Sequence, residues 1–186
     1  MLLKICEVRP WAELPKEVKD MLRQKHVEAL RDEGELSTML TDAFEKELES
    51  LGYPKSVVFS FGLERRASEG VGFYGQITNL QALRNRLLPH SGRTLSNRFL
   101  DTVTVMVNRV PHSKIKSTMG IKLQPSGSVN EMQQTALDSF AEALLNDIKA
   151  TSDRLTALGR KIIEEAGSNE KMESTLAGED QLYFID

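Results

Sequence analysis

The amino-acid sequence predicts an α+β protein: an antiparallel sheet of four to six strands, built from two hairpins, with helices on one face and a long C-terminal helix. Two pairs of β-rich runs, each joined by a turn or a polar loop, predict the hairpins. Their strands are expected at residues 57–61, 73–77, 103–107 and 119–123. Amphipathic helical patterns flank both hairpins, which is typical of helices that cover one side of an antiparallel sheet. The length of 186 residues favours a single domain over residues 1–186.

The first elements along the chain are a strand and two amphipathic helices. The strand is expected over residues 2–8. Pro15 suits the first position of a helix, which Gly34 ends. A second helix begins near Glu35, carries apolar residues at spacings of three and four, and stops at Gly52. Each helix has an apolar stripe, so each needs a sheet or another helix to cover it.

A third helix and the clearest strand follow in the centre of the chain. Thr78 is expected to cap a helix over residues 80–88, which Pro89 closes. In the next strand, three valines alternate with other side chains: Val103, Val105 and Val107. Because side chains of a strand point alternately to opposite faces, this alternation predicts one buried face.

The longest pattern, residues 130–166, predicts one helix. Apolar or small side chains recur in alternating steps of four and three, at positions 137, 141, 144, 148, 151, 155, 158 and 162. This is the repeat of a coiled-coil seam, but Thr151 interrupts its apolar character and the flanking charges show no regular pairing. We therefore expect the helix to pack across the sheet, with a homodimer through this helix as the alternative. The apolar end of the chain, residues 182–185, is expected to dock as a short edge strand.

The composition bounds where the protein acts. No run of about 18 uncharged apolar residues occurs, so neither a membrane span nor a membrane partner is expected. Lys4 and Glu7 interrupt the apolar start, which therefore cannot form the core of a secretory signal peptide. Cys6 is the single cysteine and is expected to be a small buried residue rather than a nucleophile. These features predict a cytoplasmic protein.

Charge is distributed unevenly along the chain. The net charge is only −3, yet residues 84–122 contain eight Lys or Arg and one acid, Asp101. Such a basic region is typical of a site for an anionic partner, either nucleic acid or an acidic protein surface. The other interpretation is that it pairs with the acidic segment 130–186 of the same molecule.

Motifs for cofactors and metals are not supported by their surroundings. Residues 70–75 match the letters G-x-G-x-x-G, but the glycines alternate with β-type residues, and no acid follows until Asp101. His26, His90 and His112 do not have the spacing of a zinc site. Phosphate-loop and serine-hydrolase motifs are also absent from the sequence. We therefore predict no cofactor and no metal site.

Two hairpin segments resemble those of a known family. In the first, Phe59-Ser60 is followed by a polar loop and by residues 69–75, Glu-Gly-Val-Gly-Phe-Tyr-Gly. In the second, residues 107–112, Val-Asn-Arg-Val-Pro-His, precede residues 117–119, Ser-Thr-Met. This pattern resembles a family of small phage and prophage proteins, some of which are described as antitoxins of toxin-antitoxin stability systems. The resemblance implies an origin in a phage or mobile element, and hence action in the cytoplasm of a host bacterium, rather than an activity.

These observations favour a non-catalytic protein that binds a host component, a protein or a nucleic acid, and regulates or inhibits it. The predicted binding residues are the basic side chains of the central region: Arg93, Arg98, Arg109, His112, Lys114 and Lys116. The alternative is a small hydrolase or nuclease-like enzyme in which His112 is the base, Arg109 binds an anion and Ser117 supplies a hydroxyl. No motif requires that enzyme, so we assign no catalytic residue.

Overall fold

The computed structural model describes residues 7–32, 34–63, 70–110, 118–168 and 183–185. The chain falls into two compact units: residues 1–40 with 160–186 form unit 1, and residues 41–159 form unit 2. The sequence predicted one domain over residues 1–186, whereas in the structure these residues form the two units just named. Unit 2 contains the main sheet.

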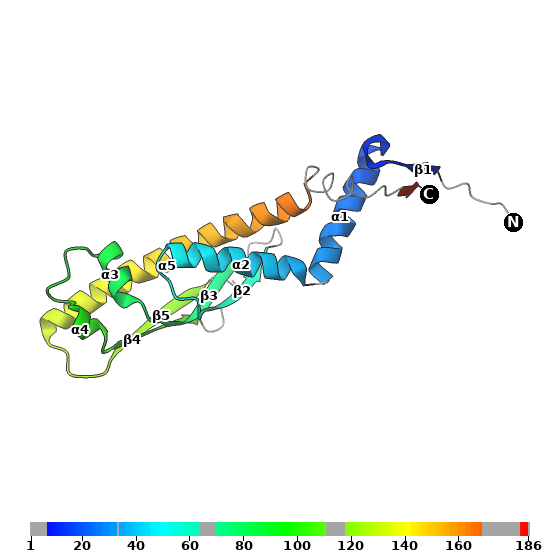
Figure 1. Ribbon diagram of the computed structural model, residues 1–186. Coiled ribbons are helices and arrows are strands. Elements are labelled where there is room, and N and C mark those ends of the chain that lie inside the picture. Colours follow the sequence, from blue (N-terminus) through cyan, green and yellow to red (C-terminus); the bar gives the residue numbers. More distant parts are fainter. Residues whose placement is uncertain (1–6, 33, 64–69, 111–117, 169–182, 186) are drawn as a thin grey trace. The chain divides into compact units, whose positions relative to one another are not determined.

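Unit 2 is built on a four-stranded antiparallel sheet in the order β2-β3-β4-β5 (Figure 1). The strands are β2 (Val58–Gly62), β3 (Gly70–Ile77), β4 (Val103–Arg109) and β5 (Met119–Pro125). Each strand pairs with the next one along the chain, so the two hairpins are those expected from the sequence. The predicted α+β class with an antiparallel sheet is confirmed, and the sheet has four strands.

One face of this sheet, its inner face, is apolar because β4 alternates as its sequence predicts. Val103, Val105 and Val107 are buried, and the exposed fraction of Val105 is 0%. Across the β4–β5 ladder, Val105 pairs with Leu123 and Val107 pairs with Ile121. The inner face is therefore the one that needs cover from helices.

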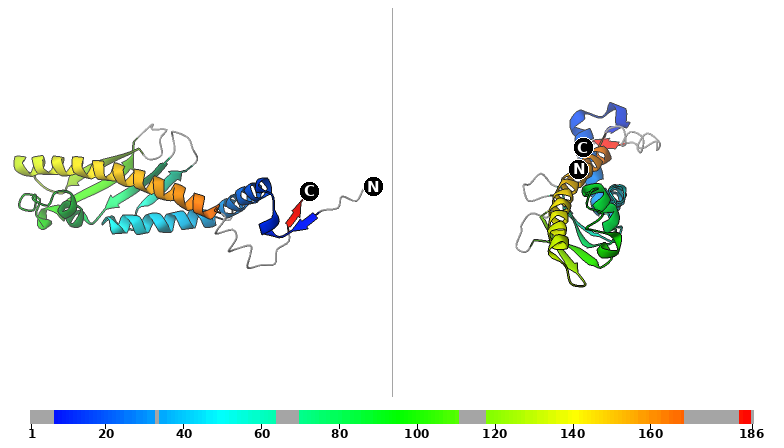
Figure 2. Two further views of the ribbon diagram at one scale, coloured as in Figure 1. Left: turned by 90° about the horizontal axis from the view of Figure 1, so that it is seen from above. Right: turned by 90° about the vertical axis from the view of Figure 1, so that its left-hand side faces the viewer.

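The helices of unit 2 supply this cover. The second half of α2 (Glu35–Ser50) and the adjoining length of α5 (Glu131–Ala166) lie on the same side of the sheet (Figure 2). The Phe44 ring of α2 lies 5.6 Å from the rings of both Phe59 and Phe61 of β2. On α5, predicted seam positions are buried, namely Leu137, Leu144, Ile148, Thr151 and Leu155. The long helix therefore packs across the sheet, as the sequence favoured.

Hydroxyl side chains of α5 complete the hydrogen bonding of β3. The ladder between β3 and β4 covers only residues 75–77 of β3, so the backbone of Val71 has no partner from β4. Instead, Ser152 Oγ donates to the Val71 carbonyl, and the Val71 N–H donates to Thr156 Oγ1 at 2.9 Å. Buried backbone groups need such partners. This requirement explains why Ser152 and Thr156, which are polar, lie on a largely apolar face of α5.

The structure differs from the sequence prediction in two local details. The third helix, α3 (Leu80–Leu87), begins after Asn79, so Thr78 is not its cap. A short helix, α4 (Asn97–Leu100), was not predicted, because four residues are too few to show a helical period. Ser96 starts α4 by accepting a hydrogen bond from the Phe99 N–H.

Unit 1 contains a two-stranded antiparallel sheet of β1 (Glu7–Arg9) and β6 (Tyr183–Ile185). β6 confirms the short strand expected at the apolar end of the chain, and it pairs with β1 rather than with the main sheet. Most of the first predicted strand, residues 2–6, lies outside the described residues.

The rest of the start of unit 1 is helical. A 3-10 turn (Trp11–Glu13) leads into α1 (Lys16–Asp32), the helix predicted to begin at Pro15. Trp11 and Leu14 are buried together and pack against apolar residues in the first turns of α1. Throughout the described ranges, no helix combines the length and the apolar character needed to cross a membrane.

Candidate functional site

The predicted binding residues that the structure describes lie at opposite ends of β4. Arg93, in the connector between α3 and α4, and Arg98, in α4, are both exposed. Arg109 is exposed at the other end of β4, whose seven residues span roughly 20 Å. The remaining candidates lie outside the described residues: His112, Lys114, Lys116 and Ser117. The described residues therefore do not test the enzyme built on His112.

Arg109 lies near Tyr74 of β3. Regular strand alternation would direct Arg109 to the apolar inner face, but at the end of β4 its side chain is exposed. Burial raises the pKa of the Tyr74 phenol, and the positive charge of Arg109 offsets part of that rise. A cation at the rim of the sheet stays in contact with water and avoids the cost of desolvation.

Two other cations of the basic region serve the fold, and the first is Arg86 of α3. It donates two hydrogen bonds to the carboxylate of Asp147 in α5, to Oδ1 at 2.7 Å and to Oδ2 at 2.6 Å. The Tyr53 hydroxyl donates to Oδ2 of the same carboxylate at 2.5 Å. Burial acts to raise the pKa of Asp147, but the hydrogen bonds from Arg86 and Tyr53 outweigh it and hold the pKa below its ordinary value. One carboxylate thus joins three segments of unit 2.

The second structural cation is Arg84, which is 6% exposed and forms no ion pair in the described part of the chain. Its Nη1 donates to the Leu95 carbonyl at 2.8 Å, and its Nη2 donates to Asn97 Oδ1 at 2.9 Å. Gly92 lies against the same guanidinium, because a Cβ at this glycine would come within 3.0 Å of Nη1. Arg84 therefore fixes the connector that leads into α4.

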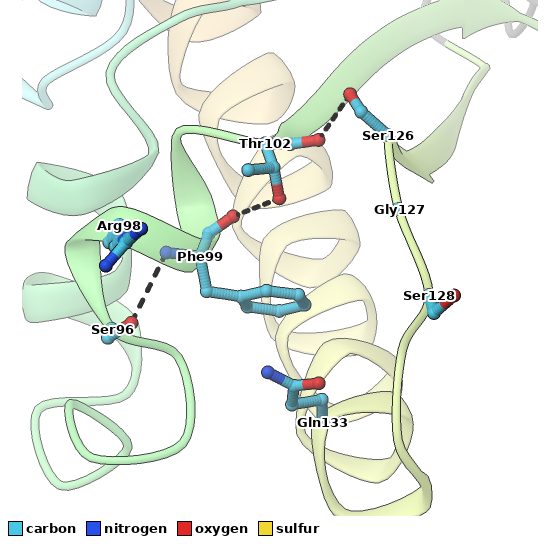
Figure 3. Close-up of a pocket in the computed structure, with 8 residues that line it drawn as sticks. All are labelled: Ser96, Arg98, Phe99, Thr102, Ser126, Gly127, Ser128 and Gln133. Atoms are coloured by element: carbon cyan, nitrogen blue, oxygen red, sulfur yellow. Dashed lines mark hydrogen bonds between the residues drawn. The ribbon is translucent and has the colours of Figure 1, made fainter.

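A hollow with a volume of about 440 Å³ opens beside α4 (Figure 3). We name it the α4 hollow. It is lined by α4, by the turn into β4, by the link between β5 and α5, and by the first turn of α5. The lining residues are Ser96, Arg98, Phe99, Thr102, Ser126, Gly127, Ser128 and Gln133. None of these residues carries a carboxylate.

Hydrogen bonds hold the walls of the α4 hollow in place (Figure 3). Ser96 Oγ accepts from the Phe99 N–H at 3.3 Å, and Thr102 Oγ1 donates to the Phe99 carbonyl at 2.7 Å. Ser126 Oγ donates to the Thr102 carbonyl at 2.8 Å, which ties the link after β5 to the turn after α4. The backbone on both sides of Phe99 is thereby fixed, and the Phe99 ring points from α4 towards α5.

Several hydrogen-bond donors in the α4 hollow are not used within the described chain. Gln133 Oε1 accepts from the Asn130 N–H at 3.1 Å, and Asn130 Oδ1 accepts from the Gln133 N–H at 2.8 Å, a reciprocal cap at the start of α5. This cap leaves both hydrogens of Gln133 Nε2 available. Arg98 and Ser128 make no hydrogen bond or ion pair with described residues. The α4 hollow therefore suits a ligand rich in acceptors or negative charge.

The acidic C-terminal segment does not pair with Arg93 or Arg98 among the residues that the structure describes. The ion pairs of α5 involve other side chains: Asp147 with Arg86, Arg154 with Glu47, and Lys161 with Glu165. Internal neutralisation, the other interpretation of the basic region, thus has no support at these two positions. Residues 169–182 of the acidic segment lie outside the described residues.

Sequence reasoning identified Arg98 but missed Phe99, Ser128 and Gln133. One pattern could have indicated Gln133, because Asn130-x-x-Gln133 has the spacing of a reciprocal helix cap. Phe99 carries no such pattern. Its place beside the start of α5 follows from the path of the chain through β4 and β5, which no local spacing reports.

Comparison of the chain with protein-family models, with curated proteins and with solved structures gives no match. Among the residues placed in the structure, no three His, Cys, Asp or Glu side chains gather to hold a metal ion. The glycines of the G-x-G-x-x-G match, Gly70, Gly72 and Gly75, all lie within β3, so no helix begins there to receive a pyrophosphate. The α4 hollow and its neighbouring cations form the candidate site.

Proposed function

We propose that this is a non-catalytic accessory protein of a phage or mobile element, which binds a host component, a protein or a nucleic acid, and so regulates or inhibits it. The observation that carries the proposal is that Arg93 and Arg98 are exposed cations without a carboxylate partner in the described chain. Both lie on a segment that Arg84 holds. The hairpin resemblance supports a phage origin and action in the host cytoplasm.

Exposed cations on an ordered backbone favour association with an anionic surface. Their field acts over a Debye length of about 10 Å at 0.1 M salt and raises the rate at which an anionic partner arrives. Because Arg84 already orders the connector, binding there costs little further backbone entropy, and the main entropic cost is the ordering of the arginine side chains. The geometry thus supports a recognition role that needs no catalytic group.

Capture from bacterial lysate tests this proposal. The immobilised wild-type protein is expected to retain a specific protein or nucleic acid, and the double variant Arg93→Glu, Arg98→Glu is expected to lose it. Lys149→Glu is the control, because Lys149 is exposed on α5, makes no ion pair with described residues, and lies roughly 24 Å along the helix from Gln133. Equal recovery by the wild type and the double variant, with unchanged thermal unfolding, would contradict the proposal.

A further inference from the structure

We infer that the α4 hollow binds one nucleotide of a single-stranded nucleic acid, with the base stacked on Phe99 and a phosphate beside Arg98. This inference rests on the proposed function and names the partner that its candidate site recognises. It assigns separate roles to the aromatic, amide and cationic side chains that line the α4 hollow.

The Phe99 ring is the first element of the inference. It is only partly buried and points from α4 across the α4 hollow towards the first turn of α5 (Figure 3). An aromatic ring that reaches solvent among serine, threonine and glutamine side chains offers an apolar surface to a flat ligand. Every nucleobase presents such a flat face, and stacking on an aromatic side chain strengthens binding by about 5- to 150-fold per base.

The amide of Gln133 is the second element. Its Oε1 already accepts from the Asn130 N–H, whereas both hydrogens of Nε2 are unused in the described chain, so Gln133 presents mainly donors to a ligand. Base edges carry carbonyl oxygens and ring nitrogens that accept such hydrogen bonds. Ser128, which has no hydrogen bond with described residues, adds a hydroxyl donor to the lining of the α4 hollow.

Charge is the third element. Arg98 lines the α4 hollow, Arg93 precedes it in the same connector, and no lining residue is acidic. A phosphate placed beside Arg98 therefore meets a cation without a competing carboxylate. Arg84 fixes the backbone of this segment through Leu95 and Asn97, so that Arg98 and Phe99 are held on one short, ordered helix.

Size selects a single strand over a duplex. A volume of about 440 Å³ is in the range of small-molecule sites, so it accommodates one nucleotide and not a helical duplex. Single-stranded nucleic acids offer unstacked bases to such sites. An acidic protein segment could satisfy Arg98 and the Gln133 donors, but its carboxylates offer no flat face to the Phe99 ring. The observations therefore favour nucleic acid.

Fluorescence anisotropy with labelled oligothymidylate and oligouridylate tests the inference, with a labelled duplex for comparison. Phe99→Leu, which keeps an apolar side chain but removes the aromatic face, is expected to weaken single-strand binding by about 5- to 150-fold. Phe99→Tyr should bind as the wild type does. Arg98→Gln should reduce the slope of log affinity against log salt by about 0.7. Lys149→Gln is the control and should leave affinity and slope unchanged.

A fluorescent purine analogue within the oligonucleotide provides a readout that a merely structural role of Phe99 would not change. Its emission should be quenched on binding to the wild type and to Phe99→Tyr, and not on binding to Phe99→Leu. Thermal unfolding of each variant establishes that the fold is retained.

The possible failures separate the inference from the proposed function. If oligonucleotide binding depends on Arg93 and Arg98 but not on Phe99, the α4 hollow is not a base site, and the proposed function stands. If no oligonucleotide binds and the lysate partner is an acidic protein lost by the Arg93→Glu, Arg98→Glu variant, the nucleic-acid inference is overturned while the proposed function survives. If neither nucleic acid nor protein depends on these arginines, both proposals fall.

Discussion

At the scale of single residues, side chains of the same type take different roles within the basic region. Arg84 is buried and holds a connector, Arg86 pairs with a carboxylate, and Arg93 and Arg98 remain exposed. A buried cation must replace its hydration with hydrogen bonds, whereas an exposed cation keeps its water. Burial, rather than residue type, therefore decides which arginines can meet a partner.

Val105 shows how much a single buried position matters. Its exposed fraction is 0% at the centre of the inner face, so Val105→Asp buries an unpaired charge and should lower the free energy of unfolding by roughly 3–5 kcal/mol. Urea denaturation followed by circular dichroism measures this loss. Gln124→Asp, an exposed position on neighbouring β5, is the control and should change stability by no more than about 0.5 kcal/mol. Equal stability of the two variants would contradict the assignment of the inner face.

At the scale of elements, polar contacts decide how helices attach to the sheet. α5 reaches the backbone of β3 through Ser152 and Thr156, and it reaches α3 through Asp147. These contacts lie on a helix whose other buried positions, apart from Thr151, are apolar or small. Apolar packing brings the elements together, and the polar pairs select one arrangement of them, because a buried group without a partner is costly.

The Asp147 cluster gives a prediction with a defined pH dependence. Asp147→Asn should lower the free energy of unfolding at neutral pH by about 1–2 kcal/mol, a modest value because Arg86 is partly exposed to solvent. The folded pKa of Asp147 lies below its unfolded value of about 3.9. The carboxylate therefore contributes fully above that pH, and its contribution is lost as the pH falls through the folded pKa.

Chemical denaturation at a series of pH values measures this difference. The gap in stability between the wild type and Asp147→Asn should close as the pH falls below about 4. Asp153→Asn, an exposed change on the same helix, should preserve the wild-type acid dependence. Parallel curves for the wild type and Asp147→Asn would show that the cluster does not hold the pKa down.

At the scale of the whole molecule, the packing of the apolar seam of α5 against the sheet affects the expected oligomeric state. Leu144, Ile148 and Leu155 are fully buried within unit 2, so a second chain could reach them only by unpacking the sheet. We expect the protein to sediment with the mass of one chain at micromolar concentration. The alternative, a homodimer through this helix, would be supported by a dimer that persists on dilution. Substitutions on the exposed side of α5 should then dissociate that dimer.

The sequence by itself determined the ranges of the long helices and the inner face of the sheet. α1, α2 and α5 begin and end within a few residues of their predicted bounds, and the valines of β4 are buried as their alternation predicts. These features are visible in the sequence because side chains that share one face recur about every 3.6 residues in a helix and every two residues in a strand. A buried face therefore appears as a regular spacing of apolar residues.

Only the tertiary structure decided which distant side chains meet. Asp147 and Arg86 are 61 residues apart, and the β5–α5 link reaches the turn after α4 through a bond between Ser126 and Thr102. The tertiary structure also separates Arg109 from the other two predicted binding residues. Arg93 and Arg98 lie before the start of β4, and Arg109 lies at its end. Local periodicity says which way a side chain points, whereas strand order and connector paths decide what it reaches, and these arise from the packing of the whole chain.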